Sequence, residues 1–156
     1  RVLLLREDIT MNKDTILLTP ECVCTEIEEG TEEELMEQMT YLLGNSGHVT
    51  DHDRLFKDIQ LRESRGSTQI KDGLWVPHAQ STGVSSMCAA AGIVEHSQIF
   101  IMISWPENTA QCLKRLASLM DILQSDKLLR RMRDAQDAHS LYTLLKDHLT
   151  ESGIPC

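Results

Sequence analysis

The first clear pattern of hydrophobic and polar positions lies at residues 31–47, where apolar residues recur at helical spacing. Thr31 and Glu34 stand three residues apart, the spacing of a capping box at a helix start. The segment 44–47 carries two glycines that end the pattern. The apolar residues at intervals of one, three and four are Leu35, Met36, Met39, Leu42 and Leu43. These features predict an amphipathic helix that begins after Thr31.

A second helix is expected over residues 51–64, capped by Thr50 together with Asp53. Its inward face carries Leu55, Phe56 and Ile59. Before both helices, residues 16–27 are expected to form two short strands that are broken around Pro20.

The middle of the chain changes to strand patterns. Residues 85–96 and 98–105 are nearly continuous apolar runs, as expected of strands that are buried on both faces. Residues 74–76 predict a further strand that Pro77 ends, because proline donates no amide to a sheet. His78 would then stand at the end of that strand, where open α/β sheets commonly gather their chemistry.

Helical spacing returns after Pro106 with a stripe made of Leu113, Leu116, Ala117, Met120 and Leu123. Ser125 caps a short helix with Leu128, Leu129 and Met132, and a last helix carries Ala138, Leu141, Leu144 and Leu145. Helices therefore bracket a central group of strands. The pattern predicts a single-domain α/β sandwich over residues 1–156, with a mixed sheet flanked by helices and a core at roughly 10–150.

The composition of the chain argues against several classes of function. The chain has 15 Lys and Arg against 24 Asp and Glu, so its formal charge of -9 gives no general attraction to nucleic acid or anionic membranes. The longest apolar stretch is too short for a membrane span, and the first ten residues are too charged for a signal peptide. The five cysteines lack a framework spacing, which favours free thiols in the cytoplasm.

A metal site is not expected. Cys22 and Cys24 have no second cysteine pair nearby, and His48 and His52 straddle a helix start, which removes the i, i+4 geometry. His139 and His148 are interpreted as solvated positions on the last helix.

The residues that could bind or transfer a phosphoryl group are concentrated in the segment that ends at His78. Arg62, Ser67 and Thr68 precede it within 17 residues, and Gly66 and Gly73 allow tight turns. A dianionic phosphoryl group needs several donors and a cation, and neutral imidazole is a competent nucleophile near pH 7. The same residues also suit an ordinary loop after a helix, so both interpretations stay open at this point.

Residues 62–79, "RESRGSTQIKDGLWVPHA", resemble the signature of the fructose- and mannitol-type enzyme IIA domains of the bacterial sugar phosphotransferase system. The pattern is Arg-Glu, Gly-Ser-Thr, a turn, and an apolar strand that ends in Pro-His. The resemblance extends more loosely over about residues 22–149, including "CLKRLASLMDILQSDKLLRRM", which is similar to the family's "HL..L..L" helix.

The resemblance implies a phosphotransferase without a cofactor or metal. His78 would accept a phosphoryl group from the histidine phosphocarrier protein and pass it to a cysteine of an enzyme IIB domain. Arg62 and Thr68 match positions that shape and charge the pocket, Ser67 is a neighbouring donor, and Cys112 stands where the family has a second histidine.

Several departures from the family are visible. Besides Cys112, Lys71 replaces a turn glycine, Trp75 replaces a small residue and is expected to fill the pocket floor, and the link at 94–98 is short. His96 in that link could approach His78 as a substitute partner. The departures favour an alternative role as a sensor that regulates a transcription regulator or other target. A third alternative is a degenerate domain that binds partners without being phosphorylated.

Overall fold

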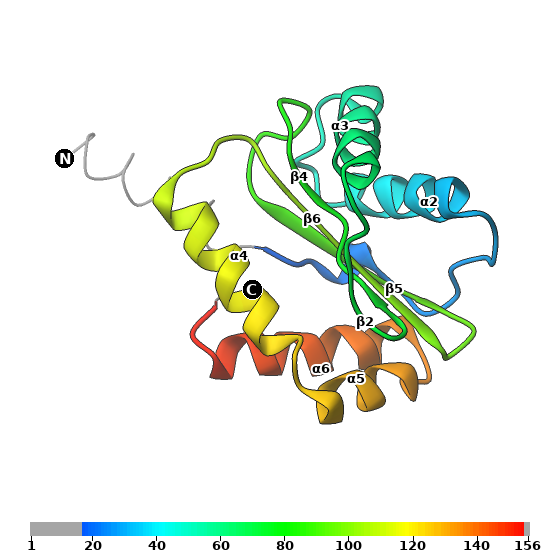
Figure 1. The fold of residues 1–156 in the computed structure, drawn as a ribbon. Coiled ribbons are helices and arrows are strands. Elements are labelled where there is room, and N and C mark those ends of the chain that lie inside the picture. Colours follow the sequence, from blue (N-terminus) through cyan, green and yellow to red (C-terminus); the bar gives the residue numbers. More distant parts are fainter. Residues whose placement is uncertain (1–16, 155–156) are drawn as a thin grey trace.

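The computed structural model describes residues 17–154, which form helices packed around one sheet (Figure 1). The helices are η1 (Pro20–Cys22, a 3-10 turn), α2 (Glu32–Gly44), α3 (His52–Ser64), α4 (Ala110–Ile122), α5 (Asp126–Arg133) and α6 (Ala138–Glu151). The strands are β1 (Val23–Cys24), β2 (Gln69–Lys71), β3 (Leu74–Trp75), β4 (His78–Gln80), β5 (Cys88–Val94) and β6 (Gln98–Trp105). The expected α/β sandwich with a mixed sheet is confirmed.

The sheet has the order β1-β5-β6-β3-β2, and β4 pairs with β6 as well. Strands β5 and β6 form an antiparallel hairpin, whereas β3 and β4 both run parallel to β6. Leu74 pairs with Ile99 and His78 pairs with Ile103, so the register is the same before and after Pro77. Strands β3 and β4 are therefore one line of chain along β6, interrupted only where proline lacks its N–H.

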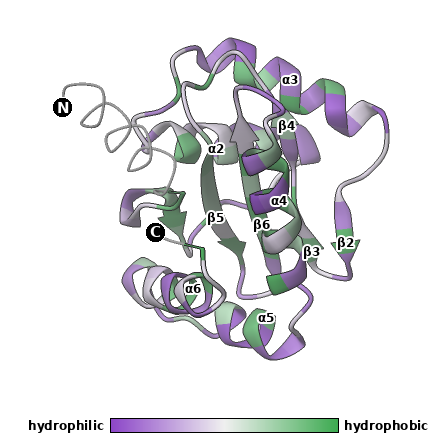
Figure 2. Ribbon diagram, turned by 90° about the vertical axis from the view of Figure 1, so that its left-hand side faces the viewer, coloured by the Kyte–Doolittle hydropathy of each residue, from purple (hydrophilic) through white to green (hydrophobic). Residues whose placement is uncertain are grey.

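The two faces of the sheet are covered by different helices. On one face, Gly92 lies so close to α2 that a Cβ there would stand 2.6 Å from the Met39 sulfur. On the other face, the side chains of Ile101, Leu119 from α4 and Leu145 from α6 line one small apolar cavity. Figure 2 shows the apolar β5 and β6 at the centre, between helices whose outer faces are hydrophilic.

The predicted helix starts hold in two cases and shift in a third. The capping box of Thr31 and Glu34 is confirmed at α2, and Ser125 caps α5. The cap of α3 is Asp51, whose side chain accepts from the Arg54 amide, so the assignment to Thr50 is wrong by one residue. Thr50 instead donates its hydroxyl proton to the Gly83 carbonyl, a contact that local sequence does not reveal.

Two other predictions need correction. Residues 17–27 hold η1 and the two-residue β1 in place of two strands, and residue 16 lies outside the described residues. In α4, the predicted stripe is confirmed at Leu116, Met120 and Leu123, which pack on the core, whereas Leu113 is 45% exposed and Ala117 is also exposed. The buried face also includes Leu119, which the predicted stripe did not contain.

The short link between β5 and β6 is a turn of three residues, 95–97. Glu95 and His96 both have positive φ, and the Ser97 amide donates to the Val94 carbonyl, as in a type I′ hairpin turn. The turn is attached to α5, because His96 Nδ1 lies 2.9 Å from the Arg133 carbonyl and Arg133 Nε donates to the Ser97 carbonyl. The hairpin tip is therefore held against α5.

Candidate active site

His78 is the first residue of β4 and is half-buried. The sequence placed it at the end of a strand, which is wrong, because pairing resumes directly after Pro77. The Pro77 carbonyl accepts from the Ile103 amide, so proline interrupts the strand without ending it. The consequence is a histidine whose backbone is fixed on both sides by pairing with β6.

The imidazole of His78 has a defined orientation. Its Nδ1 lies 2.7 Å from the Val76 carbonyl oxygen, which can only accept a hydrogen bond. Nδ1 therefore carries the proton, and Nε2 keeps its lone pair. The ring also lies against the buried Trp105, with ring centroids 6.2 Å apart and planes inclined by 20°.

Val76 connects the histidine to the loop that follows α3. Its amide donates to the Thr68 carbonyl at 3.0 Å, while its carbonyl accepts from His78. Thr68 and His78 are therefore hydrogen-bonded to the amide and to the carbonyl of the same residue, Val76. This contact joins the two halves of the sequence motif across the β2–β3 hairpin.

Glu63 is a site residue that the sequence did not single out. The Thr68 side chain, 2% exposed, donates its hydroxyl proton to one carboxylate oxygen of Glu63. The other oxygen, Oε2, is buried and has no hydrogen-bond partner among the described residues. The sequence motif contains Glu63 in its Arg-Glu pair, so a signal was present. Only Arg62 of that pair was predicted as a site residue.

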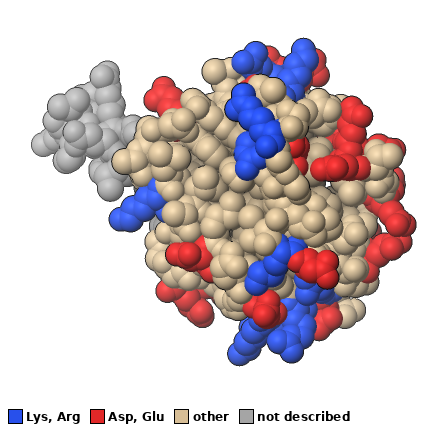
Figure 3. Space-filling view, viewed as in Figure 1, with Lys and Arg blue, Asp and Glu red and all other residues tan. Residues whose placement is uncertain are grey.

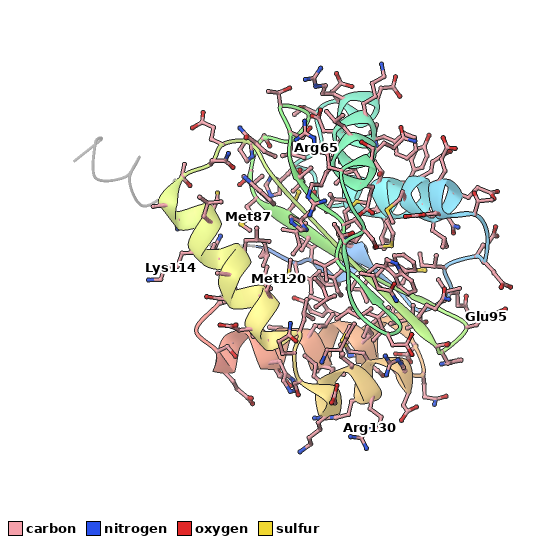
Figure 4. The ribbon with its side chains drawn as sticks, in the orientation of Figure 1. Arg65, Met87, Glu95, Lys114, Met120 and Arg130 are labelled. Atoms are coloured by element: carbon pink, nitrogen blue, oxygen red, sulfur yellow. The ribbon has the colours of Figure 1, made fainter. Side chains whose placement is uncertain are left out.

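The loop around Arg62 presents further polar groups. Arg62 donates from Nη1 to the Gly66 carbonyl at 3.0 Å, which bridges the turn after α3. Ser67 is exposed, and its Oγ accepts from the Gln69 amide. Arg65 follows α3 directly (Figure 4). Figure 3 shows Lys and Arg side chains gathered over the α3 end of the molecule and over α5, while acidic side chains line the α2 side.

Cys112 lies in the first turn of α4, where its amide donates to the Thr109 hydroxyl. The helix start expected for residue 112 is therefore confirmed. Its half-buried side chain lines a cavity together with Ser86 and Arg115, and His78 is not part of that lining. The described contacts thus join His78 to Thr68 but do not join it to Cys112.

The other departures take positions away from the imidazole. Trp75 stacks on Phe100 with centroids 5.0 Å apart, and register places it on the opposite face of β6 from His78, so the expected filling of the pocket floor is wrong. Lys71 donates to the Gln124 carbonyl and Asp126. His96 precedes β6 by two residues, whereas His78 pairs near its other end, so His96 cannot assist His78.

The remaining cysteines and histidines of the described residues are spread over several elements of the fold. Within residues 17–154, no group of three or more His, Cys, Asp or Glu side chains could hold a metal ion. Cys22 is buried in η1 and Cys24 is half-exposed in β1, so they do not share a strand face. His148 is half-buried against the Leu144 carbonyl, whereas His139 is exposed as expected. None of the helices in this part of the chain has the length and hydropathy that a membrane span requires.

Comparison with known proteins identifies the family. The profile described as "Phosphoenolpyruvate-dependent sugar phosphotransferase system, EIIA 2" matches residues 16–148. The fructose-specific EIIABC component of the phosphotransferase system of Bacillus subtilis is 24% identical over 148 residues, which are 87% of this chain and 23% of that protein. The nitrogen regulatory protein of Pseudomonas aeruginosa is 22% identical over 143 residues, 84% of this chain and 93% of that protein.

A solved structure of enzyme IIAMTL in complex with phosphorylated enzyme IIBMTL, from Escherichia coli, has the same fold. Its TM-score is 0.69 at 16% identity, and the match covers 83% of this chain and 98% of that one. The chain thus spans about a quarter of the fructose-specific relative but nearly all of the nitrogen regulatory protein. Because the profile covers most of the chain, including every residue around His78, the chain belongs to the type 2 EIIA family of the phosphoenolpyruvate-dependent sugar phosphotransferase system.

Proposed function

We propose that His78 is the phosphoryl carrier of this domain and that it reacts through Nε2. The observation that carries the proposal is the contact between Nδ1 and the Val76 carbonyl at 2.7 Å. It fixes the tautomer whose free lone pair is on Nε2, which is the nucleophilic form of imidazole. The stacked Trp105 and the paired backbone hold the ring in place, so little freedom is lost on reaction.

The donor in this proposal is the phosphohistidine of the histidine phosphocarrier protein. A bond forms between Nε2 and phosphorus as the donor's N–P bond breaks, and the electron pair of the broken bond returns to the donor ring. The Nδ1 proton stays in its bond to the Val76 carbonyl, which stabilises the positive charge that develops on the imidazole. The reaction needs no cofactor or metal, since the phosphoryl group arrives activated.

The acceptor is a cysteine thiolate of an enzyme IIB domain, in line with the IIA–IIB complex of the Escherichia coli neighbour. A bond between sulfur and phosphorus forms, and the Nε2–P electron pair returns to His78. Arg62, Ser67 and Thr68 lie at the end of α3 and in the loop after it, which Val76 connects to His78, and in this proposal they shape and charge the phosphoryl pocket. In this proposal Cys112, in the first turn of α4, takes the place of the family's second histidine, and no contact among the described residues joins it to His78 in the unphosphorylated domain. The domain would work in the cytoplasm, where both partners of such a carrier act.

The test is phosphorylation by a phosphorylated histidine phosphocarrier protein. We expect an acid-labile, base-stable mass gain of one phosphoryl group, and nitrogen-15 imidazole shifts that assign phosphorus to Nε2. His78→Ala should abolish the gain, whereas the matched change His96→Ala, at an exposed histidine on the hairpin turn, should leave it intact. Labelling of His78→Ala, or phosphorus on Nδ1 of His78, would overturn the proposal.

A regulatory role is the second candidate. It is favoured by Cys112, which stands where the family has a second histidine, and by the short link between β5 and β6; the nitrogen regulatory protein of Pseudomonas aeruginosa is a similar protein with a regulatory name. In that role the charge added to His78 would be the signal to a transcription regulator or other target. The rate of transfer from the phosphorylated domain to an enzyme IIB domain separates the two roles, because a sensor transfers slowly and a carrier transfers fast.

A further inference from the structure

The indole of Trp105 forms a fixed surface beside the imidazole of His78. His78 pairs with Ile103, and Trp105 follows Ile103 by two residues along β6, so its side chain is on the same face of the sheet as His78. The ring centroids are 6.2 Å apart and the ring planes are inclined by 20°. Because Trp105 is only 5% exposed, packing holds the indole in this position.

The indole is also held at its polar end. Its Nε1 donates to the Asn108 Oδ1 at 2.8 Å. An indole has a single hydrogen-bond donor, so this bond settles how the ring is turned within its site. Asn108 lies in the loop between β6 and α4, and Gln80 of β4 donates from Nε2 to the Pro106 carbonyl of the same loop. The loop after β6 is therefore connected to the imidazole through one side chain.

The hydrogen bond from His78 Nδ1 to the Val76 carbonyl leaves one freedom of the ring open. It fixes which edge of the imidazole faces the carbonyl, but the ring can still tilt about the line of that bond. The lone pair of Nε2 lies in the ring plane, so a tilt changes its direction. Attack on phosphorus is in line with the bond that breaks, and its rate depends on this direction. The indole restricts the tilt.

The same contact favours the charge that the reaction creates. The imidazole gains positive charge when Nε2 bonds to phosphorus, and the face of an indole carries the negative part of its quadrupole. The near-parallel planes present that face to the imidazole. The attraction strengthens as the charge develops, so it acts on the transfer step more than on the resting state.

We propose that Trp105 is a positioning residue for phosphoryl transfer and that Asn108 acts through Trp105. This role rests on the proposed function of His78 as the phosphoryl carrier. The Val76 carbonyl sets the edge of the imidazole, Trp105 sets its plane, and Asn108 sets the position of the indole. Trp105 and Asn108 both lie outside the sequence motif at residues 62–79.

The experiment is single-turnover labelling by a phosphorylated histidine phosphocarrier protein over a series of donor concentrations. It yields the rate constant at saturating donor and the donor concentration that gives half of that rate. Trp105→Leu should lower the rate constant about tenfold or more, because the ring plane is no longer fixed. The half-saturating concentration should stay within about twofold, since the buried indole is not placed to contact the donor. Trp105→Phe keeps an aromatic face but loses the bond to Asn108, so its rate constant should fall only about two- to fourfold.

A double variant tests the role of Asn108. Asn108→Ala should lower the rate constant about as much as Trp105→Phe does, and it should have no further effect in the Trp105→Phe chain, where the N–H that it accepts is gone. An effect that persists in that chain would show that Asn108 acts on the donor directly. The control is Trp75→Leu, because Trp75 stacks on Phe100 on the opposite face of β6. It should change neither constant.

Other results would overturn the role of Trp105. They are a rate constant in Trp105→Leu equal to that of the parent chain, an equal loss in Trp105→Leu and Trp105→Phe, and a loss confined to the half-saturating concentration. Thermal melting shows whether each variant is folded. If Trp105→Leu does not fold, unchanged rates in both Trp105→Phe and the exposed Asn108→Ala would refute the proposal. Absence of label in the parent chain would instead refute the carrier function of His78 and, with it, the role of Trp105.

Discussion

Replacement of Thr68 by valine tests the hydrogen bond that its side chain donates to Glu63, in the loop between α3 and β2. Valine has the shape of threonine, so the change removes a hydroxyl without leaving a cavity. The Thr68 hydroxyl donates to a Glu63 carboxylate whose other oxygen is already buried without a partner. The variant therefore leaves a partly buried carboxylate with no side-chain donor among the described residues.

The expected cost follows from that geometry. A hydrogen bond to a charged group contributes about 1.5–3 kcal/mol to the free energy of unfolding. Removal of the donor forfeits this contribution, because the carboxylate stays buried without a replacement donor. For a chain of this size, each kcal/mol corresponds to about 2–4 °C in melting temperature. We therefore expect Thr68→Val to melt roughly 3–12 °C lower than the parent chain. The exposed Thr143→Val is the matched control and should change the melting temperature by less than about 2 °C.

A double-mutant cycle isolates the contact. Urea unfolding is measured for Thr68→Val, for Glu63→Met and for the double variant, and the coupling free energy is expected to exceed about 1 kcal/mol. A coupling near zero would show that the two side chains do not stabilise one another and would refute the reasoning. The imidazole tautomer should be unaffected in all three variants, because Thr68 contacts Val76 through its backbone carbonyl.

Other predictions concern packing, titration and transfer. Gly92→Ala should lower the unfolding free energy by about 1–3 kcal/mol in urea, because its Cβ would lie 2.6 Å from the Met39 sulfur, and an unchanged midpoint would contradict this packing. Burial raises the pKa of Cys88 to about 12, so the thiol stays protonated in the fold where the unfolded chain ionises near 9. The unfolding free energy should therefore fall between pH 9 and 12, a slope that Cys88→Ala reduces and Cys112→Ala retains. Cys112→His should speed transfer to an enzyme IIB domain about 10²-fold if residue 112 reaches the phosphoryl group. An unchanged rate would place residue 112 outside the reaction.

Local sequence was sufficient wherever a signal and its structural use lie close together. Thr31 and Glu34 are bonded to each other at the start of α2, and the apolar runs of β5 and β6 follow from burial on both faces. The part of the motif from Thr68 to His78 also lies close together, since a short hairpin brings both residues to Val76. These features need no information from distant parts of the chain.

The errors arise where a distant contact decides between local alternatives. Thr50 and Asp51 are both good caps, and the Gly83 carbonyl takes the threonine hydroxyl. Pro77 lacks one donor but keeps its acceptor, so Ile103 continues the sheet past it. The burial of Leu119 in α4, the buried oxygen of Glu63 and the open cavity beside Cys112 depend on packing between elements that are far apart in sequence.

The contact between His78 and Val76 has a consequence for how this site can vary. The group that holds the Nδ1 proton is a backbone carbonyl, which every amino acid possesses. A substitution of the buried Val76 side chain that keeps the path of the strand therefore leaves the tautomer of the His78 imidazole unchanged. The path of the backbone, and not a side chain, determines which nitrogen of His78 carries the proton. A comparison of side chains alone would therefore overlook the role of residue 76.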